Sequence, residues 1–387
     1  MTILARVSNK YDTFIGIDVD KNKFSFSVID NEIMKRSRTI PSNPEMLYNY
    51  ISKNYPNKRI LFAYEAGPTG YHLYDYLLSK ATDCFVVSPN TIPKASNEKV
   101  KNNKIDSRKI TENLSAGRLK SIRVPIGDYR ELRNLVKIRE NYADARKIAK
   151  QRIKSLILHA NLYPLIKESD CNWSNRFIQN LKEISCTNAV RTRLDMLLMD
   201  LEYARKQLLI SHRYLRKFVV SNPDICRNVE YAISIPGIGF ITAVTLFAKS
   251  GDPANLLNTR ELAGFVGVTP TERSTGDKEN KGPISHLGDS KLRSLFVEAA
   301  WVAIRHDTGL RQFYYRIAAR NHPRCASQKA IVAVARKLTE RLYRVLKDQR
   351  KYIVYKKLGV RSGTGSLEMP RKQSEQHTRF EKETQEN

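Results

Sequence analysis

Two carboxylates close a short apolar run near the start of the chain. The run Phe14 to Asp20 (FIGIDVD) has strand-type alternation and carries Asp18 and Asp20 at its end. A buried strand that delivers Asp18 to its end can supply an oxygen ligand to a hard cation, because Mg²⁺ usually takes only one or two protein carboxylates. Considered alone, Asp18 is explained more simply as the cap of a turn.

A second apolar run ends in the same way. Arg59 to Glu65 (RILFAYE) closes on Glu65 and is followed by the turn AGPTG and a helical pattern over 71–79. Open α/β sheets place their sites at the carboxyl ends of strands, which makes Asp18 and Glu65 candidates for one site. The shared position at strand ends therefore favours a functional role for both carboxylates.

A third acid, Asp106, lies near the start of a helix predicted over 107–117. Asp106 is either the N-cap of that helix or a further ligand that completes an acidic cluster for two metal ions. In the second interpretation the neighbouring cations, Lys101, Lys104 and Arg108, would hold DNA phosphates.

Strands and helices alternate through the first ~120 residues, which favours an α/β layer fold. The predicted strands are 14–20, 23–29, 33–40, 59–65 and 84–88. The helices predicted before residue 107 are 44–52 and 71–79. The helix 44–52 is expected to be capped by Ser42 or Asn43.

Composition points to a polyanionic partner. The 387 residues carry 67 Lys+Arg against 39 Asp+Glu, a net charge of +28. Nucleic acid is favoured over a membrane, since no run of ~18 apolar residues is present. The first residues lack the apolar core of a secretory signal. Five scattered cysteines without a CxxC pair, and seven histidines without metal spacing, are typical of reduced thiols in the cytoplasm.

The middle of the chain predicts two long helices. The first has an apolar seam at three- and four-residue steps, and cations on its other faces. The second spans 194–215. A short connecting helix is expected within 171–187. The two helices can form an intramolecular hairpin or a dimerising coiled coil. The predicted seam of the first helix is Leu135, Ile138, Tyr142, Ala145, Ala149, Ile153, Leu156 and Ala160.

The last third contains two glycine-rich segments. Gly237 and Gly239 form a PGIG turn before an apolar helix, a pattern like the helix-hairpin-helix motif, whose glycines admit a phosphate to a helix start. Ser274 lies in a polar loop before a helix capped by Asp289. This loop is either a plain surface loop or one that presents a nucleophilic hydroxyl, although no base lies at a fixed spacing. The cations near Ser274 are Arg273, Lys278 and Lys281.

The acidic segments resemble a known family. The segments 16–21 (GIDVDK), 64–67 (YEAG) and 101–106 (KNNKID) are similar to the three motifs of the RuvC-like DEDD domain of the IS110 family of insertion-sequence transposases, which also contains pilin-gene inverting invertases. The family has two aspartates three residues apart in the last motif, and here Asn103 replaces the first. Asn103 keeps a carbonyl oxygen but removes one negative charge, which should weaken Mg²⁺ binding.

The glycine-rich segments resemble the carboxyl-terminal domain of the same family. The matching segments are 236–239 (PGIG), 262–270 (LAGFVGVTP), 274–276 (STG) and 282–285 (GPIS), followed by Leu292 and Arg293. The resemblance implies that Ser274 becomes covalently joined to DNA, with Thr275 as the alternative. It also implies Mg²⁺ or Mn²⁺ on Asp18, Glu65, Asn103 and Asp106, nucleic-acid contacts that include Arg293, a structured guide RNA, and a homodimer or tetramer.

We therefore expect an α/β plus α protein of four parts. These are a RuvC-like (RNase H-like) domain at 12–125, a helical coiled coil at 126–228, a mainly helical domain with a helix-hairpin-helix-like element at 229–356, and a disordered polar tail at 357–387. The expected function is DNA transposition in the bacterial cytoplasm, at the nucleoid. The alternatives are a metal-dependent, structure-specific DNA nuclease and an inactive nucleic-acid-binding relic disabled by Asn103.

Overall fold

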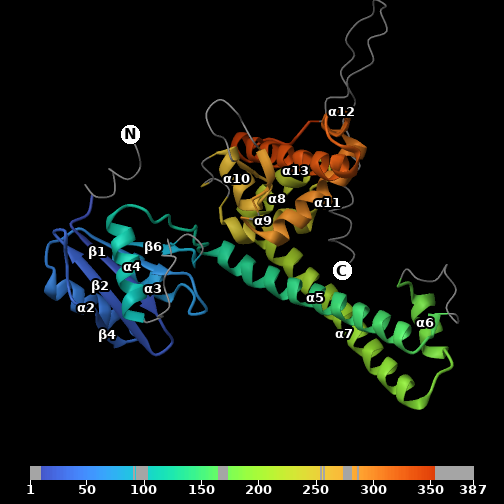
Figure 1. The fold of residues 1–387 in the computed structure, drawn as a ribbon, viewed down its shortest axis with the longest axis horizontal. Helices are drawn as coiled ribbons and strands as arrows, with labels where there is room; N and C mark the ends of the chain where they lie inside the picture. Colours follow the sequence, from blue (N-terminus) through green and yellow to red (C-terminus); the bar gives the residue numbers. More distant parts are fainter. Residues whose placement is uncertain are drawn as a thin grey trace, which may run out of the picture.

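The chain is divided into an amino-terminal α/β unit, a long helical hairpin and a carboxyl-terminal helical unit (Figure 1). This computed structural model describes residues 10–89, 92, 103–163, 173–252, 255, 258–272, 281–285 and 287–353. The predicted tail lies outside the described residues. The observed division agrees with the expected α/β plus α class.

One mixed sheet forms the frame of the amino-terminal unit. Its strand order is β3-β2-β1-β5-β6, with β4 also paired to β2. β1 pairs antiparallel with β2 and parallel with β5, and β5 pairs parallel with β6. The strands are β1 Thr13–Val19, β2 Lys23–Asp30, β3 Ile33–Met34, β4 Arg38–Pro41, β5 Ile60–Glu65 and β6 Asp83–Val87. The predicted opening hairpin is confirmed, and the third strand is split into β3 and β4.

Helices cover both faces of this sheet. α2, Pro44–Asn54, and α3, His72–Ser79, pack on the face that carries Ile15, Ile17 and Tyr64. α4, Asn103–Ser115, packs on the other face. Because side chains alternate between the two faces of a strand, every residue of β1 belongs to one of these two layers.

Two predicted helix starts have different outcomes. The side chain of Asn43 accepts hydrogen bonds from the amides of Glu45 and Met46, which confirms the predicted cap of α2. α4 begins at Asn103, four residues earlier than predicted, and Asp106 lies in its first turn. Interpreting Asp106 as an N-cap was therefore wrong: the cap must precede the helix, while Asp106 lies inside it.

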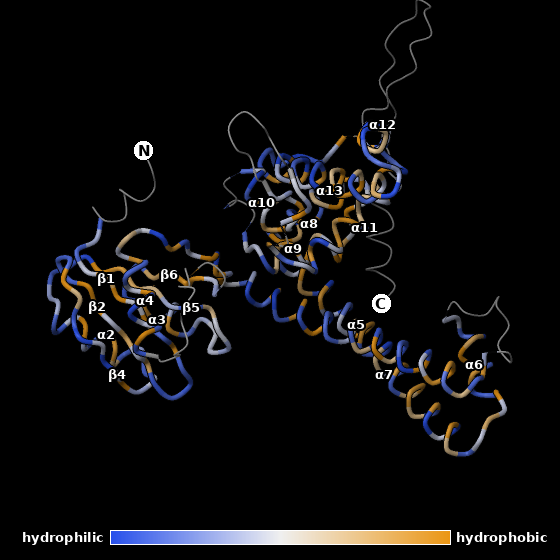
Figure 2. Tube along the Cα trace, viewed as in Figure 1, coloured by the Kyte–Doolittle hydropathy of each residue, from blue (hydrophilic) through white to orange (hydrophobic). Residues whose placement is uncertain are grey.

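The middle of the chain is an intramolecular helical hairpin. α5, Asp128–His159, packs against α7, Asn188–Ser221, and α6, Asn175–Glu183, lies between them in sequence at the far end (Figure 1). Apolar and polar residues alternate along both long helices (Figure 2). At the α6 end the hairpin has its own core, which includes Ile153, Phe177 and Leu198.

The seam of α5 agrees with the prediction only in its second half. Ala149, Ile153 and Leu156 are buried as expected, whereas Ile138 is 46% exposed. In the first half of α5 the buried apolar positions are Leu132 and Val136, which belong to the core of the carboxyl-terminal unit. The seam shifts because α5 packs against α9, Phe240–Ser250, as well as against α7.

Among its described residues, the carboxyl-terminal unit consists of helices and one small antiparallel pair of strands. Its core includes residues of both long helices, such as Val136 of α5 and Val219 of α7, together with Phe247 and Phe296. The elements are α8 Pro223–Ile233, α9 Phe240–Ser250, α10 Thr259–Val266, β7 Pro270–Glu272, β8 Lys281–Ile284, α11 Ser290–His306, α12 Thr308–Ala319 and α13 Pro323–Asp348. Within the described ranges, none of the helices is both long enough and apolar enough to span a bilayer.

Candidate active site

Asp18 and Glu65 are neighbours at the ends of two parallel strands. β1 and β5 pair up to Ile17 and Tyr64, so the next positions in register are Asp18 and Glu65. Asp18 lies two residues after Gly16, and Glu65 two residues after Ala63, which packs against α4. The period of two then directs both carboxylates to the α4 face. Asp18 is half-buried and Glu65 is exposed.

A glycine brings α4 close to this strand end. A Cβ on Gly16 would collide with the backbone nitrogen of Thr111 and would lie 2.6 Å from the carbonyl oxygen of Ser107. The amide of Gly16 donates a 3.0 Å hydrogen bond to Thr111 Oγ1. The helix therefore rests directly on the β1 backbone, two residues before Asp18.

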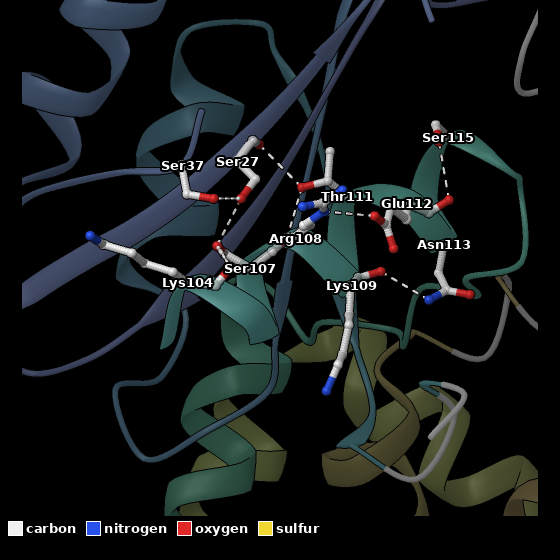
Figure 3. Close-up of polar contacts among 10 residues, drawn as sticks. All are labelled: Ser27, Ser37, Lys104, Ser107, Arg108, Lys109, Thr111, Glu112, Asn113 and Ser115. Carbon is white, nitrogen blue, oxygen red and sulfur yellow. Dashed lines mark hydrogen bonds and ion pairs between the residues drawn. The ribbon is translucent and has the colours of Figure 1, made fainter. Parts of the chain in front are cut away.

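Hydroxyl groups fix α4 on the neighbouring strand as well. Ser27 Oγ lies 3.0 Å from Ser107 Oγ and 2.7 Å from Ser37 Oγ, and Thr111 Oγ1 donates to the carbonyl oxygen of Ser27 at 3.2 Å (Figure 3). Such buried polar contacts are direction-dependent, so they fix the rotation of α4 as well as its distance.

Asp106 lies on the sheet side of α4. It stands one turn before the buried Ile110, and its Oδ1 is 3.8 Å from Lys109 Nζ. Even so, across the part of the chain that the structure describes, no three acidic, cysteine or histidine side chains are grouped closely enough to hold a metal ion. Asn103 belongs to α4 by its backbone, and its side chain lies outside the description.

The donor set fits one hard divalent cation. Asp18 and Glu65 supply two carboxylates from adjacent strands, and Mg²⁺ commonly takes one or two protein carboxylates and completes its six ligands with water and phosphate oxygens. The fit rests on this pair alone, because Asp106 does not join it in a three-residue group. The predicted two-metal cluster is therefore not assembled in the described residues.

The cations predicted to hold phosphates near α4 differ in their contacts. Lys104 is exposed, and Arg108 Nε donates a 2.9 Å hydrogen bond to Glu112 Oε1 on the next turn (Figure 3). Lys101 lies outside the described residues. An exposed ion pair of this kind is weak, so Arg108 can exchange Glu112 for a phosphate at little cost.

Strands β7 and β8 flank the serine segment. They pair antiparallel, with Glu272 opposite Lys281, and sequence inspection did not predict them. The amide of Ser285 donates to the carbonyl oxygen of Thr269 at 3.0 Å, below the paired strands. The intervening residues lie outside the description, and these include Arg273, Ser274, Thr275 and Lys278; the side chain of Lys281 does too.

Arg293 anchors the base of this small hairpin. Its Nε donates to the carbonyl oxygen of Gly267 at 2.7 Å and its Nη2 to that of Leu287 at 2.8 Å. Gly267 has φ +80°, and a Cβ there would lie 2.5 Å from Leu287 O. Arg293 thus ties the end of α10 to the approach to α11, and its predicted phosphate contact stays a prediction.

Asp289 begins α11 as predicted and also binds a lysine. Its Oδ1 accepts from the amide of Leu292 at 2.9 Å, and its Oδ2 lies 2.8 Å from Lys249 Nζ. Lys249 is also 3.6 Å from Glu140 of α5. Burial raises the pKa of the Asp289 carboxyl, but the bonds from Lys249 and Leu292 outweigh it, so the net pKa lies below the ordinary value of 3.8.

The two glycines of the PGIG turn have unequal surroundings. Gly237 has φ +93°, and a Cβ there would collide with the carbonyl oxygen of Ala299 in α11. Gly239 is the N-cap of α9, is exposed, and has open space where a Cβ would stand. Gly237 therefore serves helix packing, whereas the amide end of α9 beyond Gly239 is open to an anion.

Sequence inspection missed two features of this region. Arg123 Nη2 lies 2.7 Å from Glu261 Oε1 and connects the amino-terminal unit to α10. A row of cations on α5, with Trp173 beside it, lines a groove against α11. The only signal in the sequence was the density of Lys and Arg between 146 and 154, which a solvated helix face explains equally well.

The chain matches two family profiles of known proteins. Residues 229–315 match the profile described as "Transposase IS116/IS110/IS902 family", and residues 15–161 match a DEDD transposase profile of IS110 type. The two matched regions together cover more than half of the chain. The DEDD match covers the sheet unit and α5, and the other match lies within the carboxyl-terminal unit, from α8 into α12.

Individual relatives agree with these profiles. The chain is 27% identical to y4qE of Sinorhizobium fredii, named as a transposase, over 76% of this chain and 73% of that protein. It is 25% identical to the transposase for insertion sequence element IS1111A of Coxiella burnetii, over 78% and 80% of the two chains. It is also 26% identical to the pilin gene-inverting protein of Moraxella bovis, over 34% and 40%. The chain thus belongs to the IS110 family of transposases.

Proposed function

We propose that this protein cuts and rejoins the DNA of an insertion sequence, with Ser274 as the nucleophile and Asp18 and Glu65 as ligands of Mg²⁺ or Mn²⁺. One observation carries the proposal: the two carboxylates are register neighbours at the ends of parallel strands and face the same side of the sheet. A pair placed in this way is the oxygen donor set that a hard cation needs.

The proposed reaction is a transesterification. Ser274 Oγ attacks phosphorus, the new Oγ–P bond forms, and the bond from phosphorus to one bridging oxygen breaks. The serine proton passes to solvent, and the leaving oxygen takes up a proton to become a free hydroxyl. Attack by a hydroxyl of another strand then releases the serine and rejoins the DNA. When bound, the metal ion would polarise the scissile phosphate.

The remaining predicted ligands have secondary parts in this proposal. Asp106 on the first turn of α4 would approach the pair once DNA is bound, and Asn103 would offer a carbonyl oxygen. An amide in place of a carboxylate lowers the negative charge of the site, so we propose that this copy needs a higher metal concentration than a four-carboxylate site would.

The phosphate contacts are proposed in two groups. Lys101, Lys104 and Arg108 would hold DNA beside the acidic pair, and the amide end of α9 at Gly239 would hold a phosphate in the carboxyl-terminal unit. Gly237 would act through the packing of that turn. Near Ser274 the proposed cations are Arg273, Lys278, Lys281 and Arg293. The net charge of +28 supports a second nucleic acid, and we propose a structured guide RNA.

Self-association is proposed through the outer face of α7. Met196, Met199, Tyr203 and Tyr214 are 58–62% exposed and recur at steps of three, four and eleven residues, so they share one face. Large exposed apolar side chains grouped in this way are typical of interaction sites. A homodimer or tetramer would allow the acids of one protomer to act with the serine of its partner.

A covalent adduct tests this function. The protein is incubated with Mg²⁺ or Mn²⁺ and a labelled DNA that carries the element's own ends and flanks, and is then separated under denaturing conditions. We expect a protein-bound DNA species that Ser274→Ala removes and Thr275→Ala retains. The reverse pattern would transfer the role of nucleophile to Thr275.

Two other outcomes would overturn the proposal. Cleavage that persists in Ser274→Ala but is lost in Asp18→Ala would indicate a metal-dependent nuclease. Salt-sensitive DNA binding without an adduct at any metal concentration, followed by an adduct once Asn103→Asp is introduced, would indicate an inactive relic.

The guide RNA has a separate test. The protein is purified from cells that carry its native flanking DNA, and RNA retained through a moderate-salt wash is sequenced. One discrete, structured RNA would support guidance. Heterogeneous cellular RNA would instead indicate nonspecific binding of polyanions by a highly basic protein.

A further inference from the structure

A groove lies between α5 and the first turns of α11, far from the sheet that carries Asp18. Its volume is about 490 Å³, and Lys291 Nζ of α11 lies 3.4 Å from Asp144 of α5 at one edge. The groove, here called the α5–α11 groove, is lined by Arg146, Lys147, Lys150, Lys154, Lys291 and Trp173.

Positive charge dominates this groove. Five cations face it against two carboxylates, Asp144 and Glu298. Of these cations, Lys291 pairs with Asp144, while the four on α5 have no carboxylate within ion-pair distance among the residues that the structure describes. The four recur within 146–154, about 12 Å along the helix axis at 1.5 Å per residue. The row is therefore long enough to follow a charged backbone.

The amine of Lys150 is partly buried and is surrounded by like charges. Burial lowers the pKa of its amine, and the charges of Arg146, Arg205 and Lys154 lower it further. Burial and the charge of Arg146 likewise lower the pKa of Arg139, which lies earlier on α5 and outside the groove. Anions bound in the groove would relieve this repulsion.

Trp173 adds a fixed aromatic surface at the same place. Its ring meets Phe177 edge-on at 5.4 Å, and its carbonyl oxygen accepts from Arg205 Nη2 at 2.7 Å. Lys150 Nζ lies 5.1 Å from the centre of the ring. Phe177 and Lys150 thus contact the half-buried indole, while Arg205 holds the backbone of Trp173; Lys150 is also a cation of the groove.

We propose that the α5–α11 groove binds a single-stranded stretch of nucleic acid, with phosphates on the α5 cations and an unpaired base against Trp173. This combination of a basic track with an aromatic platform is what single-strand binding requires, since stacking accepts any base and the cations follow the backbone. The inference deepens the proposed function, on which it rests, by locating where an unpaired guide or displaced strand is held.

A paired duplex fits these features poorly. Its bases are stacked on each other inside the helix, so none is available to the indole of Trp173. An acidic peptide could satisfy the cations but would leave the aromatic surface without a planar partner. Charge and stacking together therefore favour an unpaired strand.

The chain permits a direct optical test. The sequence has two tryptophans, so the full-length Trp301→Phe variant reports on Trp173 alone. Its fluorescence is titrated with oligo(U) RNA, oligo(dT), a duplex of equal length and a poly-glutamate peptide. We expect quenching by oligo(U), oligo(dT) or both, and the stronger of the two identifies the strand as RNA or DNA. Equal quenching by the duplex, or quenching by the peptide, would overturn the proposal.

Charge variants in the same background supply the matched control. Lys150→Glu with Lys154→Glu should weaken single-strand binding about tenfold or more and flatten its salt dependence. Arg152→Glu paired with Lys137→Glu makes the same charge change at exposed positions of α5 that do not line the groove, and should weaken binding less than about threefold. Equal losses of binding in both double variants would mean that net charge alone explains the effect, and would refute binding in the groove.

The platform is tested separately by Trp173→Ala and Trp173→Phe, followed by binding of labelled oligonucleotide. Alanine should weaken binding by about tenfold, because it removes the stacking surface, and phenylalanine should restore much of the binding, because its ring can still stack on a base. These assays need no cleavage. An adduct at Ser274 with no single-strand binding in the groove would refute only this inference, whereas groove binding without an adduct would refute only the proposed reaction.

Discussion

Arg123 Nη2 lies 2.7 Å from Glu261 Oε1 and directly joins the amino-terminal sheet unit to α10 of the unit that flanks Ser274. The two side chains are 27% and 31% exposed, so solvent weakens the pair only partly. The contact is a candidate for setting the position of the acidic pair relative to the serine unit.

A charge swap tests this joint. Arg123→Glu should lower adduct formation several-fold while DNA binding changes little, because it places two carboxylates opposite each other. The double variant Arg123→Glu with Glu261→Arg should recover most of the loss. If the double variant is as impaired as the single one, the pair does not control the joint. The comparison is a double-mutant cycle on adduct yield.

Loss of one carboxylate at the strand end should abolish the chemistry without unfolding the sheet. Asp18→Asn is nearly isosteric, and we expect adduct formation to fall on the order of 100-fold or more. The matched control is Asp20→Asn, two residues on, whose exposed carboxylate accepts a hydrogen bond from the amide of Asn22. A similar loss in both variants would argue against a specific role for Asp18.

The close approach of α4 to β1 should make Gly16 intolerant of a side chain. Gly16→Ala places a methyl group against the backbone of Ser107 and Thr111, and we expect a loss of about 2–3 kcal/mol in the free energy of unfolding. Gly67→Ala is the control in the same unit, because its nearest atom would be 3.9 Å away. Denaturant melts of both variants decide the matter, and equal stability would contradict the packing.

The Lys249–Asp289 pair should make stability depend on acid pH. The folded pKa of Asp289 is depressed below 3.8, so its contribution is present above that value and is lost as pH falls through the folded pKa. Asp289→Asn keeps the helix cap but removes the charge, and should cost about 1 kcal/mol at neutral pH.

The difference between the Asp289→Asn variant and the parent protein should shrink below about pH 4. Thermal melts at several pH values measure it. Asp224→Asn is the control, since the side chain of Asp224 is 81% exposed and its pair with Arg227 should contribute little. A pH-independent gap between Asp289→Asn and the parent would be inconsistent with this account.

The exposed stripe of α7 should control association. Met199→Glu inserts a charge at the centre of the face formed with Met196 and Tyr203 and should shift the protein toward the monomer in light scattering after size exclusion. Leu209→Glu makes the same kind of change at a residue that is 65% exposed but off the stripe, and should leave the mass unchanged. If both variants behave alike, the stripe is not the interface.

Much of the fold was predictable because the signals for strands, helices and caps come from residues that are close together in the chain. Alternation predicted β1, β2 and β5, and three-four spacing predicted the long helices. Asp289 was recognised as a cap from its position, and the cap of α2 was narrowed to Ser42 or Asn43, of which the structure shows Asn43. The seam of α5 was predicted wrongly in its first half, because periodicity does not tell which neighbour a helix will meet. Leu132 and Val136 are buried by α9 and the rest of a core assembled from distant segments.

The site divides in the same way. The residues of the acidic motifs and of the serine loop were evident from type and spacing, since the chemistry of a carboxylate or hydroxyl belongs to the side chain itself. Only the tertiary structure decided that Asp18 and Glu65 are register neighbours, that Gly237 serves a helix contact, and that Arg293 binds carbonyl oxygens. The α5–α11 groove depended on it entirely, because its cations and Trp173 are separated along the chain and meet only when α5 packs beside α11.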